Sequence, residues 1–490
     1  MVFGLAARSR PEEEIMKKKP NILFLFSDQH SVRAMGDCAD TPVETPSLDR
    51  LAAGGMRFDN AYCQNPLCVP SRASLLTGKY CRTTGIYDNR HILPANGPTL
   101  ARALGSAGYR TALVGKTHFN GEQFQGFQER PYGDLYGQAH QPDPARHANE
   151  SGLGDILGDA GPSGIPLAMT QTEICVSEAA KWLQGHAGRP VDSPFFLAVH
   201  FDKPHFPINP PRRFFERFAG RVELPDYDPD WLSHAPAFVR KAAAASGTAH
   251  HRGDDAVNAR ALAAYYGCVE WVDDAVGRLL DVIDYLGLFE DTIVIYASDH
   301  GEMAARRGLW QKTVFYEDSA RVPLIIRWPG VAEAGSRTNA LAGLIDLYPT
   351  LCAAAGISPP EGLEGLDLAP VLAGGGPPDR NLFCESAVLK QPDHAGCMLR
   401  RGDWKYCLYL DGAEELYNLA DDPDEWNDLS RAPGEAALKA ELRAATEAFF
   451  RSEEFAVRYA ATPRMPFEKH FYPYSNQFIT GNGVVFDARP

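Results

Sequence analysis

The sequence predicts an α/β fold: a large α/β/α sandwich with a mainly parallel central sheet, followed by a smaller C-terminal α+β domain with an antiparallel sheet. Two observations predict the sandwich. Continuous apolar runs typical of fully buried parallel strands recur along the chain, and helical segments separate them. A third observation predicts the second domain, because a Gly- and Pro-rich hinge at 374–378 precedes a segment of short strand-like runs.

The apolar runs predict five strands, at 21–27, 111–114, 195–201, 292–298 and 323–328. A long amphipathic helix should cover one face of the sheet, because apolar residues recur at three- and four-residue spacing over 262–286. Gly287 then ends the pattern. Shorter helices are predicted over 46–53, with Ser47 as the N-cap, and over 435–450.

These patterns divide the chain into an N-terminal extension (1–19), a catalytic domain (20–375), a smaller C-terminal domain (376–452) and a tail (453–490). The end of the tail carries aromatic residues without periodicity, so it must lie on its own subunit or on a neighbouring one. We expect a homo-oligomer, a dimer or a tetramer. Two long loops, 120–170 and 225–256, are expected to roof a substrate pocket.

The composition excludes several classes of protein. The 490 residues include 48 Lys plus Arg and 63 Asp plus Glu, and 44% are hydrophobic. The resulting net charge of −15 argues against a nucleic-acid-binding protein, and the hydrophobic content argues against a disordered chain. We see neither an apolar run of about 18 residues that could span a membrane nor an export signal.

A cytoplasmic protein with mostly reduced, buried cysteines is therefore expected. A disulfide among Cys63, Cys68 and Cys81 remains an alternative, because these three residues are close in sequence.

Polar residues follow two of the predicted strands. Asp28, Gln29 and His30 come after the first strand, and Asp299 and His300 come after the fourth. Ligands bind outside the carboxyl ends of the strands in an open parallel sheet, so these two acidic positions are expected to converge. Their mainly oxygen-donor set favours a hard divalent cation, Ca²⁺ or Mg²⁺, over Zn²⁺.

The strongest local pattern is Cys68-Val-Pro-Ser-Arg72, which is followed by Leu-Thr-Gly. It closely resembles the motif of the formylglycine-dependent sulfatases of the alkaline phosphatase superfamily. Further segments resemble motifs of that family in the same order, at 21–28, 115–118, 204–207, 298–302, 308–312, 321–324 and 416–425. The chain is most similar in character to the bacterial arylsulfatase and choline-sulfatase-like branches.

The resemblance implies a sulfatase that hydrolyses small-molecule sulfate monoesters with arylsulfatase-type activity. It implies that a separate formylglycine-generating enzyme oxidises Cys68 to an aldehyde, formylglycine. The hydrated aldehyde has two hydroxyl groups. One attacks sulfur and displaces the alcohol, and deprotonation of the other then expels sulfate, whereas an ordinary serine would stay trapped as a sulfate ester.

The resemblance also implies a metal site. Asp28, Gln29, Asp299 and His300 would bind one divalent cation together with the modified Cys68. Ca²⁺ is favoured over Mg²⁺ or Mn²⁺. Gln29 departs from the family's more familiar pair of aspartates, which removes one negative charge from the site.

Six other residues receive roles in the reaction by motif position. Arg72 would hold the diol, and Lys116 and His118 would lie beside it, with His118 as the base that breaks the hemiacetal.

His205 and Lys312 would contact the sulfate and the leaving oxygen, with His205 as general acid. Asn89 would donate a further hydrogen bond to sulfate.

Other functions stay open. A phosphonate monoester or phosphodiester hydrolase uses the same scaffold, but Lys116 and His118 weigh against it because that branch tends to carry hydroxyl residues around this point. A choline-sulfatase would need aromatic residues around its quaternary ammonium, which the sequence cannot place. A non-catalytic binding protein would have lost a site residue, and none is missing. His250 and His251 are interpreted as ordinary loop residues.

Overall fold

The computed structural model describes residues 19–120, 124–134, 155–189, 193–389 and 391–464, and two short strands at 477–479 and 485–487. Most of the predicted N-terminal extension, part of the first predicted loop and most of the aromatic tail lie outside the described residues. Within the described ranges, no helix combines the length and the apolar character needed to cross a bilayer.

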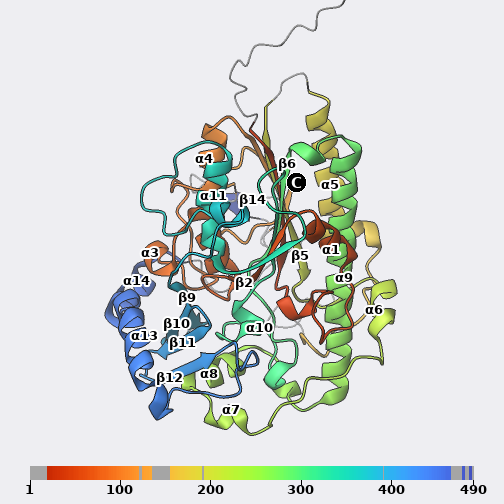
Figure 1. Cartoon of the computed structure of the whole chain (residues 1–490). Coiled ribbons are helices and arrows are strands. Elements are labelled where there is room, and N and C mark those ends of the chain that lie inside the picture. Colours follow the sequence, from red (N-terminus) through yellow and green to blue (C-terminus); the bar gives the residue numbers. More distant parts are fainter. Residues whose placement is uncertain are drawn as a thin grey trace, which may run out of the picture.

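A mainly parallel sheet forms the centre of the molecule (Figure 1). Its eight described strands lie in the order β4-β3-β5-β1-β6-β7-β2-β8. They are β1 (Asn21–Asp28), β2 (Met56–Tyr62), β3 (Arg110–Lys116), β4 (Glu129–Asp134), β5 (Phe195–Pro204), β6 (Thr292–Ser298), β7 (Leu324–Arg327) and β8 (Ser336–Gly343). Only β7 among these strands runs antiparallel to its neighbours, so the predicted parallel sheet is confirmed.

Helices cover both faces of this sheet (Figure 1). Leu23 and Leu25 of β1 pack on the side of α1 (Pro46–Ala53), α5 (Gln171–Ala187) and α9 (Asp255–Tyr285). Phe24 and Phe26 point the other way, into the cluster that includes α2 (Cys68–Thr77), α4 (Leu100–Ser106) and α11 (Leu347–Ala354). Because helices cover both of its faces, β1 has an unbroken apolar sequence.

The five predicted strands are present as β1, β3, β5, β6 and β7, and the predicted helices are present as α1, α9 and α13. The prediction that Ser47 caps α1 was wrong, because the N-cap residue is Thr45. The N–H groups of Ser47 and Leu48 instead donate to the Asp273 carboxylate of α9, at 3.0 and 2.8 Å. Asp254 caps α9 by accepting a hydrogen bond from the Val257 N–H.

The second predicted loop contains helices. After α6 (Arg212–Phe218), the chain forms α7 (Trp231–His234) and α8 (Ala237–Ala245). Phe238 of α8 is buried and stacks on Phe315 and Tyr409, with ring centroids 5.4 and 5.1 Å away. The prediction of a loop at 225–256 was wrong over α8, a helix that is rich in alanine and buries only Phe238, Val239 and Ala242.

The predicted C-terminal antiparallel sheet is confirmed, with strand order β12-β11-β10-β9. Its elements are β9 (Leu382–Val388), β10 (Gln391–Arg401), β11 (Trp404–Tyr409) and β12 (Glu414–Asn418), followed by α13 (Ala436–Phe449) and α14 (Ser452–Ala461). The remaining described elements are the short helices α3 (Cys81–Thr84), α10 (Glu317–Ala320) and α12 (Ala369–Leu372), and the paired strands β13 (Gln477–Ile479) and β14 (Val485–Asp487).

The start of the predicted tail lies on its own chain. Tyr459 of α14 is buried and donates a hydrogen bond to Asp88 at 2.7 Å. All ten cysteines are free thiols, so the alternative of a disulfide among Cys63, Cys68 and Cys81 is not realised.

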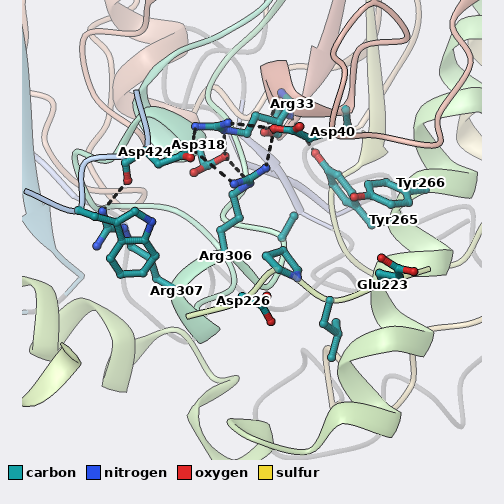
Figure 2. Close-up of a pocket in the computed structure, with 16 residues that line it drawn as sticks. Arg33, Asp40, Glu223, Asp226, Tyr265, Tyr266, Arg306, Arg307, Asp318 and Asp424 are labelled. Atoms are coloured by element: carbon teal, nitrogen blue, oxygen red, sulfur yellow. Dashed lines mark hydrogen bonds and ion pairs between the residues drawn. The ribbon is translucent and has the colours of Figure 1, made fainter. Parts of the chain in front are cut away.

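A cavity of about 340 Å³ lies where the C-terminal segment meets the larger part of the molecule (Figure 2). Arg33 and Arg306 both face the Asp318 carboxylate, and both also reach Asp424. These arginines are thus already paired with carboxylates. Tyr265 lines the same cavity and connects it to the site described next.

Candidate active site

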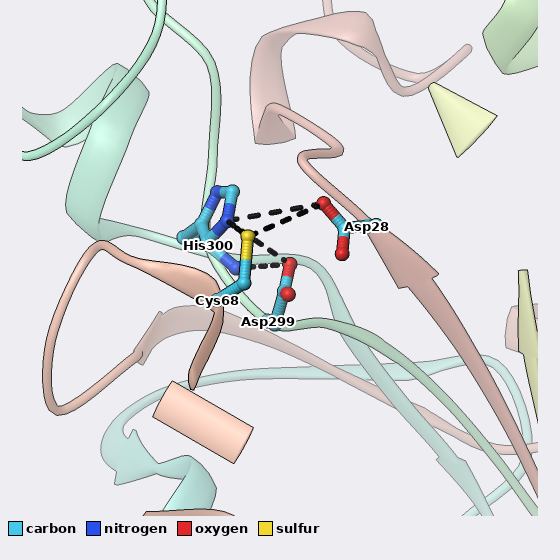
Figure 3. A group of neighbouring side chains, drawn as sticks. All are labelled: Asp28, Cys68, Asp299 and His300. Atoms are coloured by element: carbon cyan, nitrogen blue, oxygen red, sulfur yellow. Dashed lines mark hydrogen bonds and ion pairs between the residues drawn. The ribbon is translucent and has the colours of Figure 1, made fainter. Parts of the chain in front are cut away.

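Four side chains converge at the carboxyl edge of the central sheet (Figure 3). Asp28 ends β1, Asp299 and His300 directly follow β6, and Cys68 is the first residue of α2. Their potential ligand atoms all lie within 4.8 Å of one another. The two carboxylates meet because β1 and β6 are adjacent parallel strands that end in register. The structure therefore brings the two sequence-distant acidic positions together.

Cys68 is enclosed by polar groups. Its Sγ lies 3.2 Å from His300 Nε2, 3.4 Å from Lys312 Nζ and 3.9 Å from Asp28 Oδ1, and the residue is 1% exposed. Burial and the neighbouring Asp28 carboxylate raise the pKa of the thiol to about 11. Since a cysteine acts as a nucleophile in its thiolate form, the unmodified thiol suits that role poorly at neutral pH.

The start of α2 is held in place by side chains rather than by its own N-cap, Leu67. Asn89 Oδ1 accepts a hydrogen bond from the Val69 N–H at 3.0 Å, and Ser71 Oγ donates to the Asp299 carbonyl at 2.5 Å. Asn89 thus positions the helix that carries Cys68. The contact of its amide nitrogen with sulfate stays a prediction.

Arg72 is one helical turn beyond Cys68 and bridges the two carboxylates. It donates to Asp28 at 2.8 Å and to Asp299 at 2.9 Å, and Lys116 Nζ adds a second cation 2.8 Å from Asp28. Burial raises the pKa of Asp28, but Lys116 and the other nearby cations lower it more, to well below its usual value. Burial and the nearby Asp28 charge raise the pKa of Asp299.

Gln29 is fixed by partners on both sides of its amide. Its φ of 68° is in the left-handed region, its Nε2 donates to Glu302, and its Oε1 accepts a hydrogen bond from Lys312. Glu302 is fully buried and also accepts from the Ala304 N–H at 3.0 Å. Glu302 is a site residue that the motif at 298–302 contains but that was not predicted to have a role. Its position three residues after Asp299 is the signal in the sequence that could have identified it.

His205 follows β5 and is 8% exposed. Its Nε2 lies 3.8 Å from Asp28 Oδ1, and its Nδ1 is 2.7 Å from the carbonyl of Phe206. Burial and the charges of Lys116 and Lys312 lower its pKa well below 6.5, while the Asp28 carboxylate acts in the opposite direction. His118 is buried with a φ of 50°, two residues beyond Lys116. Its role as base stays a prediction.

The site has a positive balance inside an acidic chain. Arg72, Lys116 and Lys312 bring three formal positive charges next to the carboxylates of Asp28 and Asp299. Buried cations around a pocket favour an anionic ligand and stabilise charge that develops during a reaction. Tyr265 of the neighbouring cavity supports the rear of the site by donating to the Gln29 carbonyl at 2.8 Å.

Comparisons with known proteins agree with this geometry. A family model described as sulfatase matches residues 20–357, and one described as N-sulphoglucosamine sulphohydrolase, C-terminal, matches residues 305–451. A choline-sulfatase of Rhizobium meliloti (strain 1021) is 31% identical over 442 residues, which cover 85% of this chain and 83% of that protein. An arylsulfatase of Clostridium perfringens (strain 13 / Type A) is 29% identical, covering 84% and 90%.

Solved structures show the same fold. A protein in complex with its substrate, D-glucosamine-2-N,6-O-disulfate, superposes with a TM-score of 0.72 at 25% identity, covering 90% of this chain and 99% of that one. The phosphonate monoester hydrolase of Agrobacterium radiobacter superposes with a TM-score of 0.75 at 24% identity, covering 96% and 100%. At that identity the second similarity concerns the fold alone.

Proposed function

Because the chain belongs to the sulfatase family, whose members are sulfuric ester hydrolases, we propose that it hydrolyses sulfate monoesters with arylsulfatase-type activity. The nucleophile is formylglycine made from Cys68 by a separate formylglycine-generating enzyme. Its hydrate offers two hydroxyl groups, so one can take the sulfuryl group and the other can drive the release of sulfate.

One observation carries the proposal. The side chain of Cys68 is aimed at a buried cluster of metal-ligating groups and lies within reach of Lys312. The raised pKa of the thiol argues against direct attack by sulfur. An oxygen at this place, in contrast, would be surrounded by the cations that favour its deprotonation.

The donor set fits a divalent cation. Asp28 and Asp299 offer carboxylate oxygens and His300 adds a nitrogen. The side-chain oxygen of Gln29 would be a further oxygen ligand, so we favour Ca²⁺ over Mg²⁺ or Mn²⁺. When bound, such an ion lowers the pKa of an oxygen that it coordinates and neutralises charge on the sulfuryl group. The two carboxylates are held ready for it by Arg72, which bridges them.

The chain's own residues handle the substrate and the protons. Arg72 and Lys116 hold the nucleophile, and His118 is the base that takes the proton from its second hydroxyl group. Lys312 and His205 face the leaving oxygen, and His205 is the general acid once the charge of the bound anionic ester opposes the lowering of its pKa by burial, Lys116 and Lys312. A sulfate monoester carries one negative charge and its leaving group gains charge in the transition state, so cations and an acid at that oxygen contribute most.

The identity of the alcohol part of the ester is tested by comparing different substrates. Aryl sulfate, choline sulfate, sugar sulfates and aryl phosphonate esters are assayed in parallel for kcat/KM, with sulfate or alcohol release as the readout. A preference for aryl sulfate supports the proposal. A large preference for choline sulfate, as the name of one relative suggests, or for phosphonate would replace the assigned substrate.

The nucleophile is tested separately. Mass spectrometry of the peptide that contains Cys68 should show conversion to the aldehyde in enzyme from a host that supplies the maturing enzyme. Cys68→Ala should abolish turnover without loss of the fold. Full activity of an unmodified sample would contradict the role of formylglycine.

A further inference from the structure

A second cluster of metal-ligating side chains lies outside the candidate active site. It consists of Asp155, His250 and His251, and its potential ligand atoms also lie within 4.8 Å of one another. His251 Nε2 is 2.9 and 2.7 Å from the two carboxylate oxygens of Asp155. His250 Nε2 is 3.5 Å from the same carboxylate. We propose that these three residues bind a Zn²⁺ ion.

The convergence of two histidines on one carboxylate is the first argument. A simple ion pair with Asp155 needs only one imidazole, and the two rings lie with centroids 4.1 Å apart. A shared divalent cation accounts for both rings, because it can bind one nitrogen of each together with the carboxylate.

The chemistry of the donor set selects the metal. Two imidazole nitrogens and one carboxylate suit Zn²⁺ and related transition metals, whereas Ca²⁺ and Mg²⁺ prefer oxygen ligands. Bonds of about 2.0–2.2 Å in a tetrahedral site place neighbouring ligand atoms roughly 3.4 Å apart. The present separations, 2.7 and 3.5 Å from Asp155 Oδ2 to the two rings, lie on either side of that value. The fourth position faces solvent beside His250, whose side chain is 58% exposed.

Other parts of the chain help to hold Asp155 and His251 in place. The Gly158 N–H donates to Asp155 Oδ1 at 2.9 Å, and the next residue, Ile156, is buried in the apolar cluster around α9. Asn258 of α9 donates to the His251 carbonyl at 2.8 Å. Backbone and side-chain support of this kind keeps metal ligands oriented.

The ion would join two segments that are far apart in sequence. Asp155 belongs to the end of the first predicted loop, and the two histidines lie in the turn between α8 and α9. Asn258, which supports His251, accepts a hydrogen bond from Trp310 at 2.6 Å, and Trp310 is two residues from Lys312. Zn²⁺ would thus hold the segment of Asp155 against the turn before α9, and it takes no part in the chemical step.

The test measures zinc directly and does not depend on activity. Full-length protein is equilibrated with ZnCl₂ in excess Ca²⁺, which occupies the oxygen-rich site, and bound zinc is counted by plasma mass spectrometry. We expect one zinc per wild-type chain. His250→Ala and His251→Ala should each weaken zinc binding by at least about tenfold, since even changes in the surroundings of a ligand cost 10–100-fold.

Matched controls separate a lost ligand from a lost fold. His234→Ala removes another exposed histidine in the nearby helix α7 and should leave zinc binding unchanged. His250→Ala should melt like the wild type in chelator, because the side chain is mostly exposed, and only the wild type and His234→Ala should melt higher when zinc is added. Equal zinc binding by His250→Ala, His251→Ala and wild type, or no zinc on the wild type, would overturn the proposal.

Discussion

Replacing Lys312 by methionine tests the candidate active site most directly. Lys312 Nζ lies 3.4 Å from Cys68 Sγ and donates to Gln29 Oε1, and the residue is 8% exposed. Methionine keeps much of the length and the apolar stem of the side chain but removes its charge. The variant should therefore fold and lose activity.

The size of the loss follows from the distance and the burial. Two unit charges 3.4 Å apart interact by about 5 kcal/mol at an effective dielectric constant of about 20. Part of this interaction is already present in the ground state, because the ester itself is an anion. Removing one preorganised donor typically costs about 3–4 kcal/mol in the transition state. At about 1.4 kcal/mol per tenfold, we expect kcat/KM to fall by about 100- to 1,000-fold.

The assay uses a series of aryl sulfates whose phenols differ in acidity. If Lys312 stabilises the leaving oxygen, the loss in Lys312→Met grows as the phenol becomes less acidic. If Lys312 instead acts on the nucleophile made from Cys68, the loss of kcat/KM is the same for every ester. Lys241→Met, at an exposed position of α8, is the matched control and should keep full activity. A loss of less than about tenfold in a folded Lys312→Met protein would remove Lys312 from the reaction.

Three further predictions concern the metal and the contact of the C-terminal sheet with α10. Glu302→Gln should weaken Ca²⁺ binding about 10- to 100-fold, because Glu302 orients Gln29, and the free Ca²⁺ needed for half activity reports the change. Chelation should lower activity and the melting temperature together, and added Ca²⁺ should restore both. Lys405→Met should destabilise the protein by about 3–5 kcal/mol in urea unfolding, since it removes the buried cation that lies 3.0 Å from Glu317 and 2.7 Å from Glu425. Although burial opposes it, Lys405, Arg321 and Arg400 lower the pKa of Glu317 from 4.5 to about 2, so the stability from these contacts is complete above pH 4.5 and is lost as the pH falls toward 2.

The central strands could be predicted because they are buried on both faces. β1 and β6 lie next to each other in the interior of the sheet, and their unbroken apolar sequences leave little choice of structure. β2 and β8 were missed because they alternate with partly exposed polar residues, as in Met56–Tyr62. The antiparallel direction of β7 was also beyond the sequence, since an apolar run looks the same in either direction.

The candidate active site likewise contains features that the sequence predicts and features that it does not. Asp28 and Asp299 could be predicted to meet, because each ends a recognisable strand of one parallel sheet. The position of Asn89 under the start of α2 depends on a contact between segments that no periodicity encodes. His250 and His251 lie in a stretch that by itself indicates only loop residues, and no pattern connects them with Asp155, which is far away in sequence.

The unusual residue of the site, Gln29, is explained by its partner. A glutamine in place of an acidic ligand removes a negative charge next to the expected divalent cation. Glu302 places a carboxyl group behind Gln29 instead, where it accepts a hydrogen bond from the Gln29 amide. Burial raises the pKa of Glu302, which favours its neutral form, while backbone N–H groups and Lys312 oppose this effect. The amide oxygen therefore faces Lys312. Three fixed cations, Arg72, Lys116 and Lys312, lie against the carboxylates of the site, which suits an anionic ester whose leaving oxygen gains negative charge in the transition state.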